Sequence, residues 1–246
     1  MTGAILCGVG VGPGDPELIT VKAVRVLQQA DVVVVPVMEG ADTGTGRAEA
    51  TVMAYVPAER VIRAAFALDD RGGVTQRREQ AWDAAARAVL AAFDSGAGTV
   101  AFATIGDPNV YSTFTYLAQT VQDLRPDVEL STVPGITAMQ DLAARSGTVL
   151  CQGREPLTLM PITAGVEAFD AALAGPGTVV AYKGWRRMDG LVEALRRHAR
   201  LSDAVIGTGL GLPGERIGPA AAVNGPLPYL STVLVPSCRD TRGGKL

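Results

Sequence analysis

Three short segments rich in glycine and proline carry the residues best suited to holding a ligand. They read GVGPGDP at 10–16, IGDP at 105–108 and VPGIT at 133–137. Each follows an apolar run that predicts a buried strand and precedes a helical pattern. In an open parallel sheet, loops of this kind gather at the carboxyl edge of the strands, where ligands bind. A tight turn explains each glycine taken alone, but the three segments together predict a single site.

The first segment does not have the pattern of a dinucleotide-binding loop. That fingerprint requires glycines at its first, third and sixth positions. Counting from Gly8 puts Pro13 at the sixth position, and the registers that start at Gly10 and Gly12 fail as well. Asp15 also places a carboxylate at the start of the next helix, where a phosphate would need free amide donors. The lysine of a Walker loop is missing too, so the segment favours an uncharged or zwitterionic ligand.

The composition excludes several classes of protein. Because 48% of the 246 residues are hydrophobic, a sizeable core is expected. The net charge of -3 predicts no basic field that would attract nucleic acid. There is no apolar run of about 18 residues, which predicts no membrane span. The three cysteines have neither disulfide nor metal spacing, and there is one histidine, His198. With no charged leader before the first strand, we expect a cytoplasmic chain without a bound metal.

Apolar periodicity predicts an α/β fold in two domains. Strands are predicted at 4–9, 31–36, 60–63, 99–103 and 128–133, and then at 157–162, 178–182, 203–208, 216–218 and 229–235. Helices are predicted after the first segment, at 48–55, at 75–93, from 110, from 138, at 166–173 and at 188–199. Regular alternation in 1–147 predicts a mostly parallel sheet, and the change of pattern after it predicts a mixed sheet in 148–246.

The helix after the first segment has the clearest start signal. Asp15 is predicted as its N-cap, with proline and glutamate in the first turn. Leu18, Val21, Val24 and Leu27 recur at helical spacing, which predicts that one helix contains all four.

Longer stretches around the three segments resemble the tetrapyrrole methylases. The stretches are GVGVGPGDPELITVKAVRVLQQADVV at 8–33, TIGDPNVYSTFTYL at 104–117 and TVPGITAMQDLAAR at 132–145, in the order that the family shows. The resemblance implies two α/β domains with a cleft between them for S-adenosylmethionine, whose product is S-adenosylhomocysteine. It also implies a homodimer and a tetrapyrrole substrate. The stretch DPNVYSTFTYL is most similar to the branch that methylates precorrin-2 at C20, in cobalamin biosynthesis.

The resemblance also implies site residues, motif by motif. The cofactor-binding positions that match are Pro13, Gly106, Asp107, Pro108, Val110, Tyr111, Ser112, Thr137, Ala138, Tyr182, Lys183, Leu210 and Ser231. Lys183 departs from the methionine of many members. Asp107 is suited to pairing with the ammonium group of the cofactor, and its alternative role is a helix cap.

Residues for the substrate are sought in the loop from Met38 to Arg47. Tyr111 and Glu39 are the candidates to accept a proton, with Tyr111 as the catalytic candidate and Glu39 and Arg47 as substrate-binding ones. The substrates of the family carry many carboxylates, and arginines such as Arg47 and Arg63 suit bidentate pairing with them. Each of these arginines is alternatively an ordinary surface residue.

Other activities are weighed against this one. Within the family they are uroporphyrinogen III C-methylation, a later precorrin methylation, and methylation of ribosomal RNA or of a modified protein histidine. Outside it they are a nicotinamide-dependent oxidoreductase, which the glycine spacing disfavours, and a non-catalytic small-molecule sensor.

Overall fold

The computed structural model consists of two compact units, Met1–Thr137 and Ala138–Leu246, each with its own sheet. It describes residues 3–38, 44–68, 70, 73–163, 165–183, 187–223, 225, 227–228, 230–239 and 241. No helix among these residues has the length and apolar character that crossing a membrane requires. Each unit is described by itself below.

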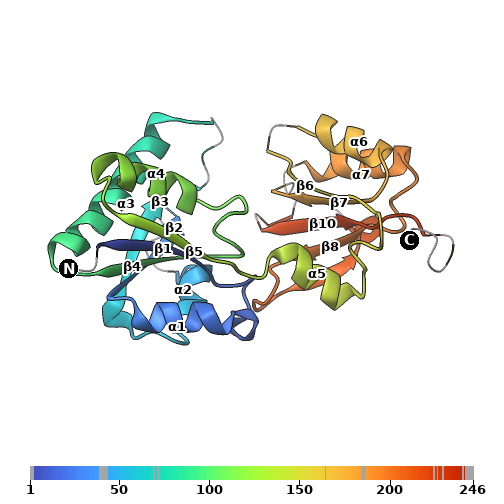
Figure 1. Ribbon diagram of the computed structural model, residues 1–246. Helices are drawn as coiled ribbons and strands as arrows, with labels where there is room; N and C mark the ends of the chain where they lie inside the picture. Colours follow the sequence, from blue (N-terminus) through green and yellow to red (C-terminus); the bar gives the residue numbers. More distant parts are fainter. Residues whose placement is uncertain are drawn as a thin grey trace. The chain divides into compact units, whose positions relative to one another are not determined.

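The first unit is built on a five-stranded parallel sheet (Figure 1). Its strands are β1 (Ile5–Gly10), β2 (Val32–Met38), β3 (Val61–Phe66), β4 (Thr99–Thr104) and β5 (Glu129–Val133). They lie in the order β3-β2-β4-β1-β5, and every pairing is parallel. A parallel sheet is covered on both faces, which explains why the central strands are nearly continuous apolar runs.

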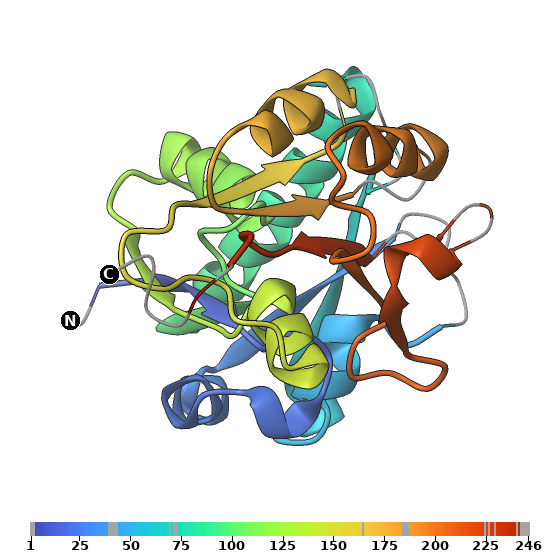
Figure 2. The same ribbon diagram turned by 90° about the vertical axis from the view of Figure 1, so that its right-hand side faces the viewer.

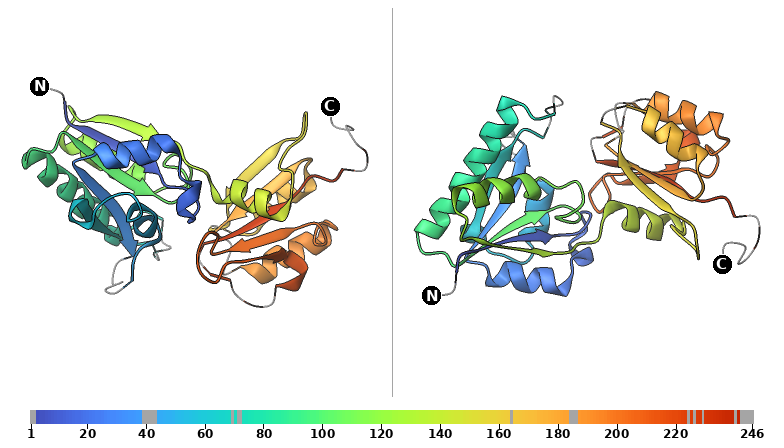
Figure 3. Two further views of the ribbon diagram at one scale, coloured as in Figure 1. Left: turned by 90° about the horizontal axis from the view of Figure 1, so that it is seen from below. Right: turned by 45° about the horizontal axis from the view of Figure 1, so that its top comes forward.

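Four helices cover this sheet (Figures 1 and 3). They are α1 (Val21–Gln29), α2 (Arg47–Val52), α3 (Gln76–Asp94) and α4 (Phe114–Leu124). One core cluster joins α1 and α2 to the face that carries Val33 and Val35, and another joins α3 and α4 to the face that carries Val34 and Phe102. Side chains of consecutive strand residues point to opposite faces, so each apolar run serves both clusters.

The helix after the first segment begins later than predicted. Asp15 caps only a short 3-10 turn, Pro16–Leu18, in which the Glu17 amide donates to the Asp15 Oδ1 over 2.9 Å. The chain is then extended, and α1 has its own N-cap, Thr20, whose hydroxyl accepts from the Ala23 amide at 3.1 Å.

The prediction of one helix from Leu18 to Leu27 was therefore wrong. Val21 is 86% exposed, and the buried residues of α1 are Ala23 and Leu27. The extended residues between the 3-10 turn and α1 shift the helical register, so the periodicity that runs through Leu18 does not describe one helix.

The order of the strands places the three predicted loops together. They follow β1, β4 and β5, and these three strands are neighbours in the parallel sheet. Because all three strands run the same way, their following loops leave the sheet at one edge. The prediction that the segments at 10–16, 105–108 and 133–137 share the carboxyl edge is confirmed.

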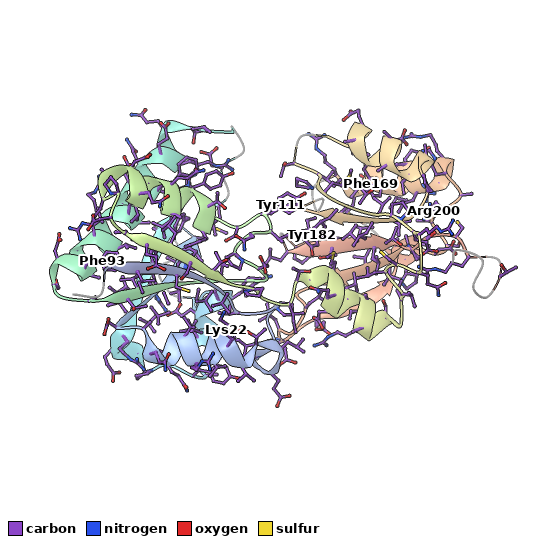
Figure 4. All side chains as sticks on the ribbon, in the orientation of Figure 1. Lys22, Phe93, Tyr111, Phe169, Tyr182 and Arg200 are labelled. Atoms are coloured by element: carbon purple, nitrogen blue, oxygen red, sulfur yellow. The ribbon has the colours of Figure 1, made fainter. Side chains whose placement is uncertain are left out.

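The second unit is built on a mixed sheet. Its strands are β6 (Leu157–Pro161), β7 (Thr178–Tyr182), β8 (Val205–Thr208), β9 (Arg216–Pro219) and β10 (Ser231–Val235), in the order β6-β7-β10-β8-β9. Only the β6–β7 pair among them is parallel. Helices α6 (Glu167–Ala174) and α7 (Met188–Arg197) cover one face, and Phe169 lies in that layer (Figures 2 and 4).

The other face of this sheet carries α5 (Ala138–Ser146). The buried side chains of α5, Leu142 and Ala143, pack in one cluster with Val180 and Leu234 of the second sheet. The division between the units therefore falls between residues 137 and 138, before α5, whereas the sequence pattern placed it between 147 and 148.

One ion pair joins the C-terminal segment to the turn before β6. Arg239 donates from Nε to Glu155 Oε1 at 2.9 Å and from Nη2 to Glu155 Oε2 at 2.6 Å. The Glu155 side chain is 1% exposed and also accepts from the Gln152 amide at 2.8 Å. These donors, chiefly the Arg239 guanidinium, hold the pKa of Glu155 at about 2, below its ordinary 4.5.

This pair predicts part of the acid sensitivity of the fold. A folded-state pKa that is lowered contributes stability above the unfolded pKa, and this is lost as the pH falls from about 4.5 toward about 2. In Arg239→Gln, unfolding by urea should be easier at pH 7, and stability should fall less steeply between pH 4.5 and 2. An unchanged pH dependence in the variant would contradict this role of Arg239.

Candidate functional site

The three loops of the first unit touch through glycine backbone. The Gly106 amide donates to the Gly12 carbonyl at 2.8 Å, which forms an isolated bridge between the first two loops. A Cβ at Gly10 would lie 2.5 Å from the Gly106 carbonyl oxygen and 2.6 Å from the Gly135 nitrogen. A Cβ at Gly135 would lie 2.0 Å from that same Gly106 oxygen. We call Gly10, Gly12, Gly106 and Gly135 the glycine junction.

Asp107 fastens the second loop to the third. Its Oδ2 accepts from the Gly135 amide at 3.0 Å, and its Oδ1 accepts from the Asn109 amide at 2.8 Å. It does not cap α4, which begins at Phe114, so the helix-cap alternative was wrong. A carboxylate offers about four acceptor positions, so Asp107 keeps acceptor capacity beyond these two amides.

Tyr111 and Ser112 lie in the turn before α4, which begins at Phe114 and not at Val110 as predicted. The Ser112 hydroxyl donates to the Thr104 hydroxyl at 2.9 Å and accepts from the Phe114 amide at 3.1 Å, so it ties this turn to the end of β4. Tyr111 is 44% exposed and has a φ of 51°. A non-glycine residue held in this conformation costs roughly 1–3 kcal/mol, and such residues cluster at functional sites.

The other predicted cofactor residues of the first unit lie within these loops, and most of their side chains are buried. The side chains of Pro13, Pro108 and Thr137 are buried, and Val110 is half-buried. The Val110 amide donates to the Asp107 carbonyl at 3.2 Å, which closes a turn in the second loop. The structure thus brings together the eight predicted cofactor residues of this unit on loops that meet at the glycine junction.

In the second unit, Tyr182 holds the start of α5. Tyr182 is the last residue of β7, and its hydroxyl accepts from the Met139 amide at 2.9 Å (Figure 4). Ala138, Tyr182 and Leu210 all pack in the cluster that contains Leu142. A backbone amide in the first turn of a helix has no partner within the helix, so the Tyr182 hydroxyl serves as its cap.

The two other predicted residues of this unit lie at the ends of the paired strands β7 and β10. Lys183 directly follows β7 and has a φ of 60°, another strained non-glycine position. Ser231, the first residue of β10, is buried, and its hydroxyl donates to the Pro228 carbonyl at 2.6 Å.

Of the two residues predicted to bind the substrate, Glu39 and Arg47, the structure describes Arg47. Glu39 lies outside the described residues. Arg47 is the first residue of α2, is half-buried, and has its pKa lowered by that burial. Among the residues that the structure describes, Arg47 has no hydrogen-bond or ion-pair partner. It is therefore a cation held partly out of water, with no anionic partner in the described part of the chain.

Glu49 is a buried carboxylate beside Arg47 and Arg63 that the sequence analysis did not consider. It is 6% exposed, and its Oε1 accepts from Arg63 Nε at 2.8 Å while its Oε2 accepts from the Gly46 amide at 3.0 Å. It therefore orients Arg63 and anchors the backbone next to Arg47. The bond from the Gly46 amide to Glu49 is one half of a capping box, and Gly46 lacks the side chain that marks this motif in a sequence, so no local signal pointed to Glu49.

Comparison with known proteins gives one consistent family. The model of the tetrapyrrole (corrin/porphyrin) methylases matches residues 6–222. A precorrin-2 C(20)-methyltransferase of Sinorhizobium sp is 33% identical, covering 96% of each chain. A cobalt-precorrin-2 C(20)-methyltransferase of Salmonella typhimurium is 31% identical, covering 94% of this chain and 95% of its own.

Solved structures share the fold. A cobalt precorrin-4 methyltransferase has a TM-score of 0.68 at 20% identity, with 94% of each chain covered. The uroporphyrin-III C-methyltransferase of Thermus thermophilus, complexed with S-adenosylhomocysteine, has a TM-score of 0.64 at 23% identity, with 94% of this chain and 97% of that one covered.

The glycine junction predicts a severe effect of one methyl group. Gly135→Ala should lower the free energy of unfolding by about 2–3 kcal/mol, because its Cβ meets backbone that cannot move aside. Gly44→Ala is the matched control in the same unit, since no heavy atom lies within 4 Å of its added Cβ. Its stability should stay within about 0.5 kcal/mol of the unaltered chain. Urea denaturation measures the stability of both variants. Equal stabilities would contradict the close backbone packing at Gly135.

Proposed function

This chain belongs to the tetrapyrrole methylases, and we propose that it methylates precorrin-2 at C20 with S-adenosylmethionine as the methyl donor. The family match over residues 6–222 carries the coarser activity, methyl transfer from S-adenosylmethionine to a tetrapyrrole in cobalamin biosynthesis. The choice of C20 is supported by two relatives that bear this position in their names and that cover at least 94% of the chain.

The donor set around the glycine junction fits this cofactor. The segments 10–16, 105–108 and 133–137 contain no lysine, arginine or histidine, and Asp107 is their acidic group nearest the junction. A zwitterionic amino acid suits such loops, whereas a phosphate needs cations or free amides. Gly106 is buried, and a Cβ there would have one neighbour, the Thr137 Cα at 3.9 Å, so there is free space beside its backbone.

The residues proposed to bind the cofactor come from both units. In the first unit they are Pro13, Gly106, Asp107, Pro108, Val110, Tyr111, Ser112 and Thr137. In the second unit we propose Ala138, Tyr182, Lys183, Leu210 and Ser231, of which Ala138, Tyr182 and Leu210 share one apolar cluster.

The methyl transfer requires little from the protein beyond orienting the two reactants. S-adenosylmethionine supplies a methyl group on a positively charged sulfur, ready for attack by a nucleophilic carbon of a reduced tetrapyrrole. The chain therefore acts chiefly by holding both reactants in line, which lowers a barrier by roughly 7–11 kcal/mol. Tyr111 is our candidate to accept the proton that the ring gives up, because it is 44% exposed on a loop that meets the junction.

Arg47 and Arg63 are proposed to bind carboxylates of the substrate. Arg63 uses Nε for Glu49, and its Nη atoms have no hydrogen-bond partner within the described part of the chain. Arg47 is half-buried and unpaired there as well. Charge-assisted hydrogen bonds to a carboxylate would satisfy both guanidinium groups.

The proposed activity is tested by methyl transfer in vitro. The purified chain is given S-adenosylmethionine labelled with ¹³C in its methyl group, with precorrin-2, its cobalt complex and uroporphyrinogen III offered separately. We expect one methyl group to be added to precorrin-2 or its cobalt complex, with the label at C20 by NMR. Labelling of uroporphyrinogen III instead would contradict the proposal in favour of a sibling activity.

Arg47→Ala should weaken binding of the tetrapyrrole. Loss of a charge-assisted hydrogen bond corresponds to an increase in KM for the tetrapyrrole of about tenfold or more, with the affinity for S-adenosylhomocysteine unchanged. Arg25→Ala, at an exposed position of α1, is the control and should leave KM unchanged. Equal KM values for the two variants would remove Arg47 from the substrate site.

A further inference from the structure

A chain of charged hydrogen bonds joins α5 to the loop between β8 and β9. Asp141 Oδ1 accepts from Arg145 Nε at 2.7 Å, and Arg145 Nη1 donates to Glu215 Oε1 at 2.7 Å. Glu215 Oε2 in turn accepts from the Gly211 amide at 2.6 Å. Arg145 is therefore the link between a helix and a loop that lie 70 positions apart in the sequence.

Burial makes Arg145 hard to replace in this chain. Asp141 is 3% exposed, and its Oδ2 is buried with no hydrogen-bond partner among the described residues. A buried carboxylate without a cation is strongly unfavourable, so Arg145 offsets much of the cost of burying Asp141. An apolar residue at position 141 would avoid that cost, which indicates that the network has a use beyond stability.

The loop that the network holds has little rigidity of its own. Gly209, Gly211 and Gly214 all have positive φ, so the loop depends on residues with wide conformational freedom. The Glu215 carboxylate fixes the middle of the loop through the Gly211 amide. Leu210, directly before that amide, is 5% exposed and packs in the cluster with Leu142 of α5.

Helix α5 is thus fastened at two places that matter for the proposed cofactor residues. Its start is held by the Tyr182 hydroxyl at the Met139 amide, and its last turn is held through Arg145. Ala138 lies on α5, Tyr182 ends β7 and Leu210 lies in the loop between β8 and β9, and all three pack in the cluster that contains Leu142 of α5.

We infer that Arg145 is a positioning residue for the cofactor, which sets the loop carrying Leu210 against α5 through Glu215. This inference rests on the proposed function, because it takes Leu210 as part of the cofactor site. In this inference Arg145 acts through Glu215 and the Gly211 amide. It therefore affects how tightly the cofactor is held and leaves the chemical step alone.

The test separates binding from chemistry. In Arg145→Ala, the Kd of S-adenosylhomocysteine should rise about tenfold or more, while kcat at saturating S-adenosylmethionine should stay within about twofold. Arg145→Lys should recover part of the affinity, because one ammonium can pair with Glu215. Arg196→Ala is the matched control: its ion pair with Glu193, at 3.8 Å, is exposed and lies on α7. The Kd of S-adenosylhomocysteine should be unchanged in Arg196→Ala.

A second measurement does not depend on the cofactor. In Glu215→Ala, hydrogen exchange at the Gly211 amide should quicken on the order of tenfold, because the amide loses a charged acceptor. Unchanged exchange there, or an unchanged Kd in a folded Arg145→Ala chain, would overturn the inference. If the unaltered chain binds no S-adenosylhomocysteine, the proposed function itself fails and the inference falls with it.

Discussion

The close contact of three glycines at the edge of the parallel sheet is the constraint on which the candidate site depends. Gly10, Gly106 and Gly135 follow or end three neighbouring strands, and their backbones approach so closely that no Cβ fits at Gly10 or Gly135. The Gly12–Gly106 bridge and the bonds of Asp107 lock the same loops together. The glycines at this edge therefore serve mainly to pack the three loops against one another. A ligand would bind to the surface that these packed loops form.

This packing explains why the first segment resembles a nucleotide-binding loop without its spacing. In a dinucleotide-binding loop, glycine makes room for a pyrophosphate at a helix start. In this chain, Gly12 accepts the Gly106 amide, and Asp15 occupies the acceptor position at the start of the 3-10 turn. A loop closed in this way favours a ligand without phosphate at that point, and a sulfonium amino acid meets this requirement.

The fold was predictable where the apolar pattern is local, and the site was predictable only in part. Strand β7 lies at 178–182 as the run of β-branched residues predicted, and the alternation of elements predicted one parallel and one mixed sheet. The start of α1 was missed, because two extended residues interrupt a periodicity that looks continuous in the sequence. The bonds from Asp107 to Gly135 and from Arg145 to Glu215 span 28 and 70 residues, and no local spacing encodes these two pairs. The motifs thus indicated which loops meet, whereas the bonds that hold them required the structure.

The most direct measurement is calorimetric titration of the purified chain with S-adenosylhomocysteine, with NADH as the comparison ligand. If the glycine junction builds a site for a sulfonium amino acid, S-adenosylhomocysteine should bind and NADH should give no heat of binding. Binding of NADH without binding of S-adenosylhomocysteine would contradict this account of the loops and the proposed activity together.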